Sequence, residues 1–292
     1  IEGIELAYVI DLVRRISPKS RIIFDDHNAE YVLQRRSYSA DRSTPRRWPA
    51  ALYSRVQASR LRRYERQACN SADHVVAVSD IDRQHLLALD LRTPVSVIPN
   101  SIDVSEYAPD GHSKKAYDLV FVGKMDYRPN IDAVRWFANE IWPKIRQARP
   151  PTTIAIVGKN PHSRLAQLDG VTGITITGRV EKVQPYLYGS KVFIMPFRVG
   201  GGTRLKLIEA MASGRAIVST TVGAEGFALH SGQQLLLADR PSKFAEAVLA
   251  LLEDESLRRK VGEQARRFAE QYDWRQVAPR FYRIIEDLFT KR

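Results

Sequence analysis

The stretch Gly200-Gly201-Gly202-Thr203-Arg204-Leu205-Lys206-Leu207-Ile208-Glu209 decides the fold of this chain. The apolar segment 192–197 precedes it and has the composition of a buried strand. Apolar residues then recur through 205–212 as in a buried helix, and Gly214 stands where a helix C-terminal glycine belongs. The three glycines therefore connect a strand to a helix predicted over 203–213, which is the repeating unit of parallel α/β proteins.

The same glycine stretch has the properties of an anion-binding loop. Backbone N–H groups at the start of a helix lack intrahelical partners, and glycine lets a ligand approach that backbone closely. Arg204 and Lys206 add two cations, so we expect a phosphate or diphosphate to bind here. Glu209 lies about 9 Å further along the helix axis, a suitable place for a carboxylate that accepts hydrogen bonds from sugar hydroxyls. The alternative is a tight turn that only connects the strand to the helix.

Length and composition indicate a globular protein of about two domains. Of the 292 residues, 44% are hydrophobic, and no run of about 18 apolar residues is long enough to span a bilayer. The chain begins at Ile1 and carries no signal peptide, so we expect a processed or excerpted piece of a longer protein. Cys69 is the only cysteine and has no partner for an internal disulfide, which is compatible with a reducing, cytoplasmic compartment.

The net charge of +12 is concentrated in one segment of the chain. Two interpretations stay open: a solvated basic face, or a patch that draws the protein to the inner, anionic face of a membrane, where a lipid-linked acceptor would lie. Nucleic acid is not expected as a partner, because no recognised module or aromatic platform accompanies the charge. The segment from 35 to 66 holds ten arginines, at positions 35, 36, 42, 46, 47, 55, 60, 62, 63 and 66, against Asp41 and Glu65.

Short apolar strands alternate with helices along the chain, which predicts α/β architecture with parallel sheets. The second part holds a complete doubly wound domain, whereas the first hundred residues resemble the second half of another sheet domain. A missing N-terminal segment or a second chain is therefore a candidate partner for the first domain. Predicted strands are 21–25, 74–78, 94–98, 118–122, 153–157, 174–177, 192–195, 216–220 and 234–238; predicted helices include 50–70, 131–146, 181–188, 203–213, 242–253, 255–271 and 275–289.

Several motifs together resemble the family 4 retaining glycosyltransferases of the GT-B fold. The resemblance implies two Rossmann-like doubly wound parallel-sheet domains, the first one partial here, with a nucleotide-sugar donor between them and a last helix that crosses back. We expect domains at 1–99 and 100–272, with the crossing helix at 273–292. The motifs are Asp26-His27-Asn28-Ala29-Glu30, Ile98-Pro99-Asn100-Ser101-Ile102-Asp103, Phe121-Val122-Gly123-Lys124-Met125, Pro129-Asn130-Ile131-Asp132-Ala133, Gly178-Arg179-Val180, Pro196-Phe197 and the run from Gly200 to Ala212.

The resemblance implies transfer of a hexose from a nucleoside diphosphate sugar to a glycan or lipid-linked acceptor with retention. It makes His27, Arg204 and Lys206 catalytic, with the two cations stabilising the leaving diphosphate. For His27 the alternative is a hydrogen-bonded structural histidine. For Lys124 and Arg128 it is a solvated cation, and for the pair Arg179 and Val180 a simple turn. The implied donor-binding residues are Gly200, Gly201, Gly202, Thr203, Glu209, Lys124, Arg128, Arg179 and Val180.

Two departures from the family pattern affect the functional prediction. The family's acidic motif has two glutamates, and Gly201 stands where the first would lie before Glu209. The basic pair that usually follows the first strand of the second domain is represented only by Lys124 and Arg128. A truncated or degenerate module that binds a nucleotide or a partner without turnover is therefore the alternative function.

No metal or cofactor is expected beyond the donor itself. Asp80-Ile81-Asp82 spells the metal-binding pattern of the other major glycosyltransferase fold, but Ser79 before it is a good helix N-cap, and acids in a first helical turn complement the helix dipole. No histidine and cysteine cluster has zinc spacing. We predict a helix start at this position.

Overall fold

The computed structural model describes residues 1–42, 48–108, 117–168 and 170–290. The chain forms two compact units. Unit 1 comprises Ile1–Asn100 and Val277–Arg292, and unit 2 comprises Ser101–Gln276. Each unit has its own cluster of buried apolar side chains.

Unit 2 is built on a six-stranded sheet in which every pairing is parallel. The strand order is β6-β5-β4-β7-β8-β9, so the chain winds outward from β4 in both directions. In such sheets ligands bind at the carboxyl ends of the strands where the order reverses, which here is between β4 and β7. The strands are β4 (Tyr117–Val122), β5 (Ile154–Val157), β6 (Ile174–Gly178), β7 (Ser190–Met195), β8 (Ala216–Ser219) and β9 (Leu236–Leu237).

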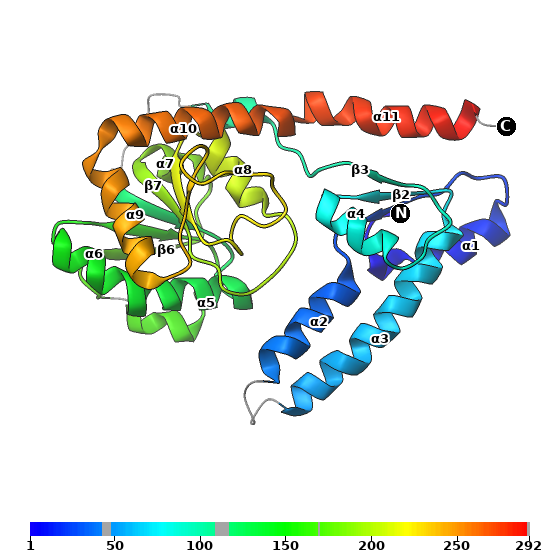
Figure 1. Cartoon of the computed structure of the whole chain (residues 1–292), viewed down its shortest axis with the longest axis horizontal. Helices are drawn as coiled ribbons and strands as arrows, with labels where there is room; N and C mark the ends of the chain where they lie inside the picture. The colour runs from blue at the N-terminus through cyan, green and yellow to red at the C-terminus, as the bar shows by residue number, and fades with distance from the viewer. Residues whose placement is uncertain (43–47, 109–116, 169, 291–292) are drawn as a thin grey trace. The chain divides into compact units, whose positions relative to one another are not determined.

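Helices lie on both sides of this sheet (Figure 1). The sequence predicted a helix over 131–146, and the structure is helical throughout this range, but a π-helical turn, Phe137–Ile141, interrupts the α-helical hydrogen bonding between α5 and α6. Pro143 lies in the first turn of α6 and lacks the N–H that a continuous helix would need there. The helices are α5 (Arg128–Trp136), α6 (Trp142–Ala148), α7 (Gln184–Tyr188), α8 (Leu205–Ala212), α9 (Pro241–Glu253) and α10 (Glu255–Ala269).

The core of unit 2 explains why its strands were readable from sequence. The central strands are buried on both faces, and β5 and β8 are buried at every residue. Continuous apolar runs of this kind are typical of parallel sheets covered by helices. Phe121 and Phe197, whose ring centroids lie 5.8 Å apart, pack at the carboxyl ends of β4 and β7, where they form an apolar floor.

Unit 1 contains a three-stranded parallel sheet in the order β1-β2-β3. Its strands are β1 (Ile23–Asp26), β2 (His74–Ala77) and β3 (Val95–Val97), and its helices are α1 (Val9–Ile16), α2 (Glu30–Asp41), α3 (Trp48–Ser71) and α4 (Asp80–Leu87). The last helix, α11 (Trp274–Thr290), contributes its residues from Val277 onward to this unit. Helices α2 and α3 lie side by side (Figure 1).

Helix α2 was not predicted, and its first turn shows why. Glu65, which belongs to α3, accepts hydrogen bonds from the backbone N–H groups of Glu30 (2.7 Å) and Tyr31 (3.4 Å). A carboxylate from another helix therefore satisfies the N-terminal donors that a local capping residue usually satisfies. Because Glu65 is 35 residues away from Glu30 in the chain, no local pattern marks where α2 begins.

Candidate functional site

The glycine loop between β7 and α8 requires glycine at two of its positions. Gly200 has φ +116° and Gly202 has φ +72°, both in the region that side chains with a Cβ rarely adopt. A Cβ on Gly200 would also lie 2.8 Å from Nη2 of Arg204. Thr203 follows, and Gly226 packs so closely on it that a Cβ there would lie 2.7 Å from the Thr203 methyl group.

Helix α8 begins two residues later than sequence predicted. Arg204 is the N-cap residue, with φ −106° and ψ 103°, and Leu205 is the first helical residue. The Leu207 N–H donates to the Arg204 carbonyl at 2.9 Å. Within the described part of the chain, the N–H groups of Leu205 and Lys206 have no protein partner, so these two amides, not that of Thr203, are the donors that open the helix.

The Arg204 side chain is held against the protein and forms one wall of the site. Its Nη1 donates to the Val222 carbonyl at 2.6 Å, and its guanidinium carbon lies 4.7 Å from the centre of the Phe197 ring. These contacts fix a positive charge beside the helix start.

Lys206 lies over the apolar floor of the site. Its Nζ donates to Oδ1 of Asn130 at 2.9 Å and lies 5.4 Å and 5.1 Å from the ring centres of Phe121 and Phe197. A Cβ on Gly123, just past β4, would lie 2.8 Å from Nζ, so glycine there makes room for the ammonium group. Burial, with the nearby Arg204 charge, lowers the pKa of Lys206 to about 8.

Asn130 is a site residue whose function sequence reasoning missed. It is 2% exposed, and its Nδ2 donates to the Lys124 carbonyl at 2.7 Å while its Oδ1 accepts from Lys206. The side-chain amide therefore ties the loop after β4 to the ammonium of α8. The sequence signal was its place in the motif Pro129-Asn130-Ile131-Asp132-Ala133, which carried part of the family resemblance but gave Asn130 no role.

Glu209 lies one turn beyond Lys206 and also has a protein partner. The hydroxyl of Tyr107 donates to its Oε1 at 2.9 Å, and burial together with the Glu209 charge raises the pKa of Tyr107. Tyr107 ends a short 3₁₀ helix, Val104–Tyr107, that lies 102 residues upstream of Glu209. No local pattern could have identified this pair.

The other predicted site residues of unit 2 differ in their exposure and in their distance from the glycine loop. Lys124 is 56% exposed and pairs with Asp126 at 3.6 Å, and Arg128 is the exposed first residue of α5. Arg179 and Val180 follow β6, which is three strand spacings from β7, or about 14 Å. Arg179 is exposed, whereas Val180 packs against the core. In the structure, the segment 200–209 lies next to Gly123 and Asn130.

His27 follows β1 in unit 1 and has a carboxylate on each side of its ring. Its Nε2 lies 3.0 Å from Oε1 of Glu2 and its Nδ1 lies 3.5 Å from Oδ1 of Asp25. Burial raises the pKa of Asp25, while His27 acts to lower it. These contacts orient the imidazole, and they match the structural alternative as well as a functional role.

A buried pair of carboxyl groups, Asp26 and Glu65, lies next to this segment and was not predicted. The two residues are 1% and 0% exposed. Burial, reinforced by Glu65, raises the pKa of Asp26 to about 9, and burial raises that of Glu65 to about 7. At neutral pH the pair therefore retains at least one proton, which lets one carboxyl group donate to the other.

The predicted helix start at Ser79 is confirmed. Its hydroxyl accepts from the Asp82 N–H at 3.1 Å, and α4 begins at Asp80. In the described ranges no group of three histidine, cysteine, aspartate or glutamate side chains is arranged to hold a metal ion.

Comparison with protein families covers most of both units. The family described as Glycosyltransferase Family 4 matches residues 10–106, and the family described as Glycosyl transferases group 1 matches residues 116–254. The phosphatidyl-myo-inositol mannosyltransferase of Mycolicibacterium smegmatis is 28% identical over 72% of this chain and 56% of its own length. An uncharacterized glycosyltransferase of Methanocaldococcus jannaschii is 26% identical over 74% of this chain and 59% of its own. The chain thus spans a little over half the length of these relatives.

Solved structures with a similar fold extend over almost the whole chain. Sucrose-phosphate synthase from Thermosynechococcus elongatus has a TM-score of 0.74 at 17% identity, covering 100% of this chain and 73% of its own. Anabaena HepE in complex with UDP-glucose has a TM-score of 0.69 at 13% identity, covering 97% and 77%. These identities bear on the fold alone, and they confirm the predicted α/β architecture. With both family domains matched in order, the chain belongs to the family 4 glycosyltransferases and has the GT-B fold.

Proposed function

We propose that this protein transfers a hexose from a nucleoside diphosphate sugar to a glycan or lipid-linked acceptor, with retention of the anomeric configuration. The observation that carries the proposal is the start of α8. Two amides without a partner among the described residues lie there, beside a half-buried ammonium group and a fixed guanidinium, over an apolar floor. Positive groups that surround helix N–H donors favour a diphosphate.

The donor diphosphate binds the N–H groups of Leu205 and Lys206 in this proposal. Arg204 and the Lys206 ammonium neutralise its charge, and the backbone of Gly200, Gly201, Gly202 and Thr203 borders it. Glu209, held by Tyr107, accepts from the ribose hydroxyls. Support comes from Anabaena HepE, whose structures contain UDP or UDP-glucose.

Catalysis in this proposal is electrostatic. As the glycosidic bond breaks, negative charge grows on the leaving phosphate oxygen, and donors already in place stabilise that charge without reorganising. The leaving phosphate takes the acceptor's proton on the same face of the sugar, which retains the configuration. We propose that Lys206 and Arg204 replace a metal ion in this role. His27 lines the donor sugar, Lys124 and Arg128 contact the diphosphate, and Arg179 and Val180 border the nucleobase.

The proposed acceptor is lipid-linked, and the proposed location is the inner face of the cytoplasmic membrane. The mycobacterial relatives are named for transfer to phosphatidyl-myo-inositol. Helix α3 adds five exposed arginines on unit 1, as a protein working at an anionic surface would require. Arg46 and Arg47, which also belong to the basic segment, lie outside the described residues.

A transfer assay tests this function. The protein is incubated with a panel of labelled UDP- and GDP-hexoses and with vesicles that contain phosphatidylinositol or polyprenyl phosphate, and labelled lipid is counted. We expect one donor to give product and Lys206→Met to reduce the rate at least about a hundredfold. Absence of donor binding by calorimetry would contradict the proposal.

A non-catalytic function remains the second candidate because Gly201 stands where the family carries a glutamate. That candidate predicts calorimetric binding of a nucleoside diphosphate without any labelled product. Product formation by the wild-type chain, lost in Lys206→Met but kept in Lys260→Met, would exclude it. Lys260 is an exposed residue of α10 and serves as the charge-matched control.

A further inference from the structure

Helix α3 has an outward surface with many positive charges and no negative ones. Its 24 residues contain one acid, Glu65, which is 0% exposed and engaged at the start of α2. Its buried side is formed by small residues, among them Ala51, Ser54, Ala68 and Cys69. The arginines of the helix are all exposed, namely Arg55, Arg60, Arg62, Arg63 and Arg66.

The first half of this outward side carries large apolar side chains. Trp48, Leu52 and Val56 are 62%, 63% and 47% exposed. Their spacing of four residues places them above one another on one face of the helix. Tyr53 and Tyr64 are also exposed, at 64% and 38%. A row of exposed apolar residues on one helix face marks an interaction surface more than scattered single residues do.

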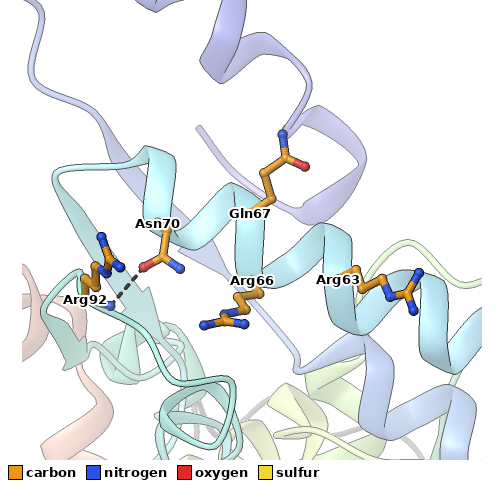
Figure 2. A pocket seen from close by; sticks show the side chains of 5 residues that line it. All are labelled: Arg63, Arg66, Gln67, Asn70 and Arg92. Atoms are coloured by element: carbon orange, nitrogen blue, oxygen red, sulfur yellow. Dashed lines mark hydrogen bonds between the residues drawn. The ribbon is translucent and has the colours of Figure 1, made fainter.

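The second half of the same face is basic and hollowed. Arg63, Arg66 and Asn70 continue the spacing of three to four residues from Val56. With Gln67 and Arg92 they line a pocket of about 440 Å³ (Figure 2). The Arg92 backbone N–H donates to Oδ1 of Asn70 at 2.9 Å, which attaches the segment after α4 to the end of α3.

Among the residues that the structure describes, one carboxylate forms an ion pair with these pocket arginines. Asp90 pairs with Arg66 at 3.1 Å, and the Asp90 side chain is 94% exposed. A pair this exposed holds its partners weakly, so an incoming anion competes for Arg66 at little cost. Guanidinium groups bind phosphate oxygens in a bidentate manner, which gives the pocket the chemistry of a phosphate site.

We propose that the outward face of α3, defined by Trp48, Leu52, Val56, Arg63, Arg66 and Arg92, docks on an anionic phospholipid bilayer. The apolar half enters the boundary between headgroups and acyl chains, where tryptophan and tyrosine are favoured. The basic half takes a headgroup phosphodiester into the pocket. This inference deepens the membrane contact of the proposed function and names the residues that make it. None of the described helices is long and apolar enough to cross a bilayer.

A membrane explains both halves of the face, whereas a soluble anion explains only one. A free phosphate would use the arginines and leave Trp48, Leu52 and Val56 exposed to water. The lining side chains of the pocket are also exposed, so a single phosphate gains little there against bulk solvent. A bilayer presents many phosphates at once and removes the apolar residues from water in the same step.

Vesicle sedimentation tests the proposal with the whole chain. Wild-type protein is mixed with vesicles of phosphatidylglycerol and phosphatidylcholine, or of phosphatidylcholine alone. We expect binding to the anionic vesicles, weakened about tenfold or more in Arg63→Gln/Arg66→Gln/Arg92→Gln. Trp48→Ser/Leu52→Ser should retain binding at low salt and lose it at high salt, because only the screened electrostatic part remains. The controls are Arg259→Gln on α10 and Ile81→Ser on α4, both exposed, and circular dichroism verifies that every variant folds.

Three results would overturn the proposal. They are equal binding of both vesicle types, unchanged binding of the two α3 variants, and displacement by millimolar glycerol phosphate, which would indicate a site for soluble anions. Calorimetry with UDP and GDP separates this proposal from the donor site. The α3 variants should bind nucleotide as wild type does, and Lys206→Met should bind vesicles as wild type does.

Discussion

At the scale of single residues, Lys206 couples the site to pH. Its pKa is lowered to about 8 by burial, so the free protein loses this charge as pH rises from 7 to 9. A bound diphosphate restores the charged form, and binding must then take up a proton. We expect the affinity for UDP or GDP to fall up to about tenfold per pH unit above 8. Calorimetry at pH 7, 8 and 9 measures this dependence.

The neutral variant Lys206→Met separates this effect from titration of the nucleotide itself. Its binding should be weaker at pH 7, and the steep fall above pH 8 should disappear. Lys260→Met should show the wild-type profile. A wild-type profile in Lys206→Met would mean that the ammonium group does not contact the diphosphate.

Asp26 makes the stability of unit 1 depend on pH. Because its folded pKa of about 9 lies above the unfolded value of 3.8, its contribution is complete below pH 4 and is lost as pH rises towards 9. Asp26→Asn keeps a neutral group that can donate to Glu65. We expect its Tm to exceed that of wild type by several degrees at pH 9, with a smaller difference at pH 5. The exposed Asp11→Asn is the control, and an equal pH slope in wild type and Asp26→Asn would contradict the assignment.

Tyr107 is expected to act through Glu209. Tyr107→Phe removes one hydrogen bond of about 1 kcal/mol, which lets the carboxylate leave the geometry needed for a ribose contact. We expect UDP or GDP to bind about fivefold more weakly. The affinity for inorganic pyrophosphate, which lacks the ribose, should not change. Tyr186→Phe, on a ring that stacks with Tyr117, should change neither. An equal loss for both ligands would show that Tyr107 only supports the fold.

At the scale of elements, the strands were predictable and the contacts between elements were not. β4, β5, β7 and β8 are apolar runs bounded by turn residues, and each was predicted to within two residues of its observed ends. The start of α2 depends on Glu65, and the Lys206–Asn130 contact joins residues 76 positions apart. Such pairs can be identified only when the strand order is known. A single sequence therefore predicts the strand-loop-helix unit but not the partners of its side chains.

The glycine loop can be tested as an element. Gly200→Ala introduces a Cβ at φ +116° that would lie 2.8 Å from Arg204, so we expect a loss of about 1–2 kcal/mol in stability and weaker UDP or GDP binding. Gly170→Ala has a comparable φ of +85° but nothing within 4 Å. It should lower stability by a similar amount and leave nucleotide binding unchanged. Denaturant unfolding measures the change in stability, and calorimetry measures the change in nucleotide binding. Unchanged nucleotide binding in Gly200→Ala would show that the glycine loop is not part of the binding site.

At the scale of the whole molecule, the strand order of unit 2 brings the residues of the proposed donor site together. The order β6-β5-β4-β7-β8-β9 places the carboxyl end of β4, with Gly123, next to that of β7 and the glycine loop. The sequence pattern predicted parallel strands and a helix start, and the reversal of strand order brings Lys206 over Phe121 and Phe197. The parts of the prediction that rest on both units together, including the place of His27 beside the donor, remain predictions.

The two units have separate buried cores, and the larger one contains the proposed donor site. We therefore expect two unfolding transitions in differential scanning calorimetry. Nucleoside diphosphate at a hundredfold excess over its Kd adds about 2.7 kcal/mol to the unit that binds it, so only the transition of unit 2 should move upward. Asp26→Asn should move only the other transition, and Lys206→Met should abolish the nucleotide shift. A single transition raised by nucleotide would mean that the units unfold together, and a shift of the Asp26-sensitive transition would place the nucleotide on unit 1.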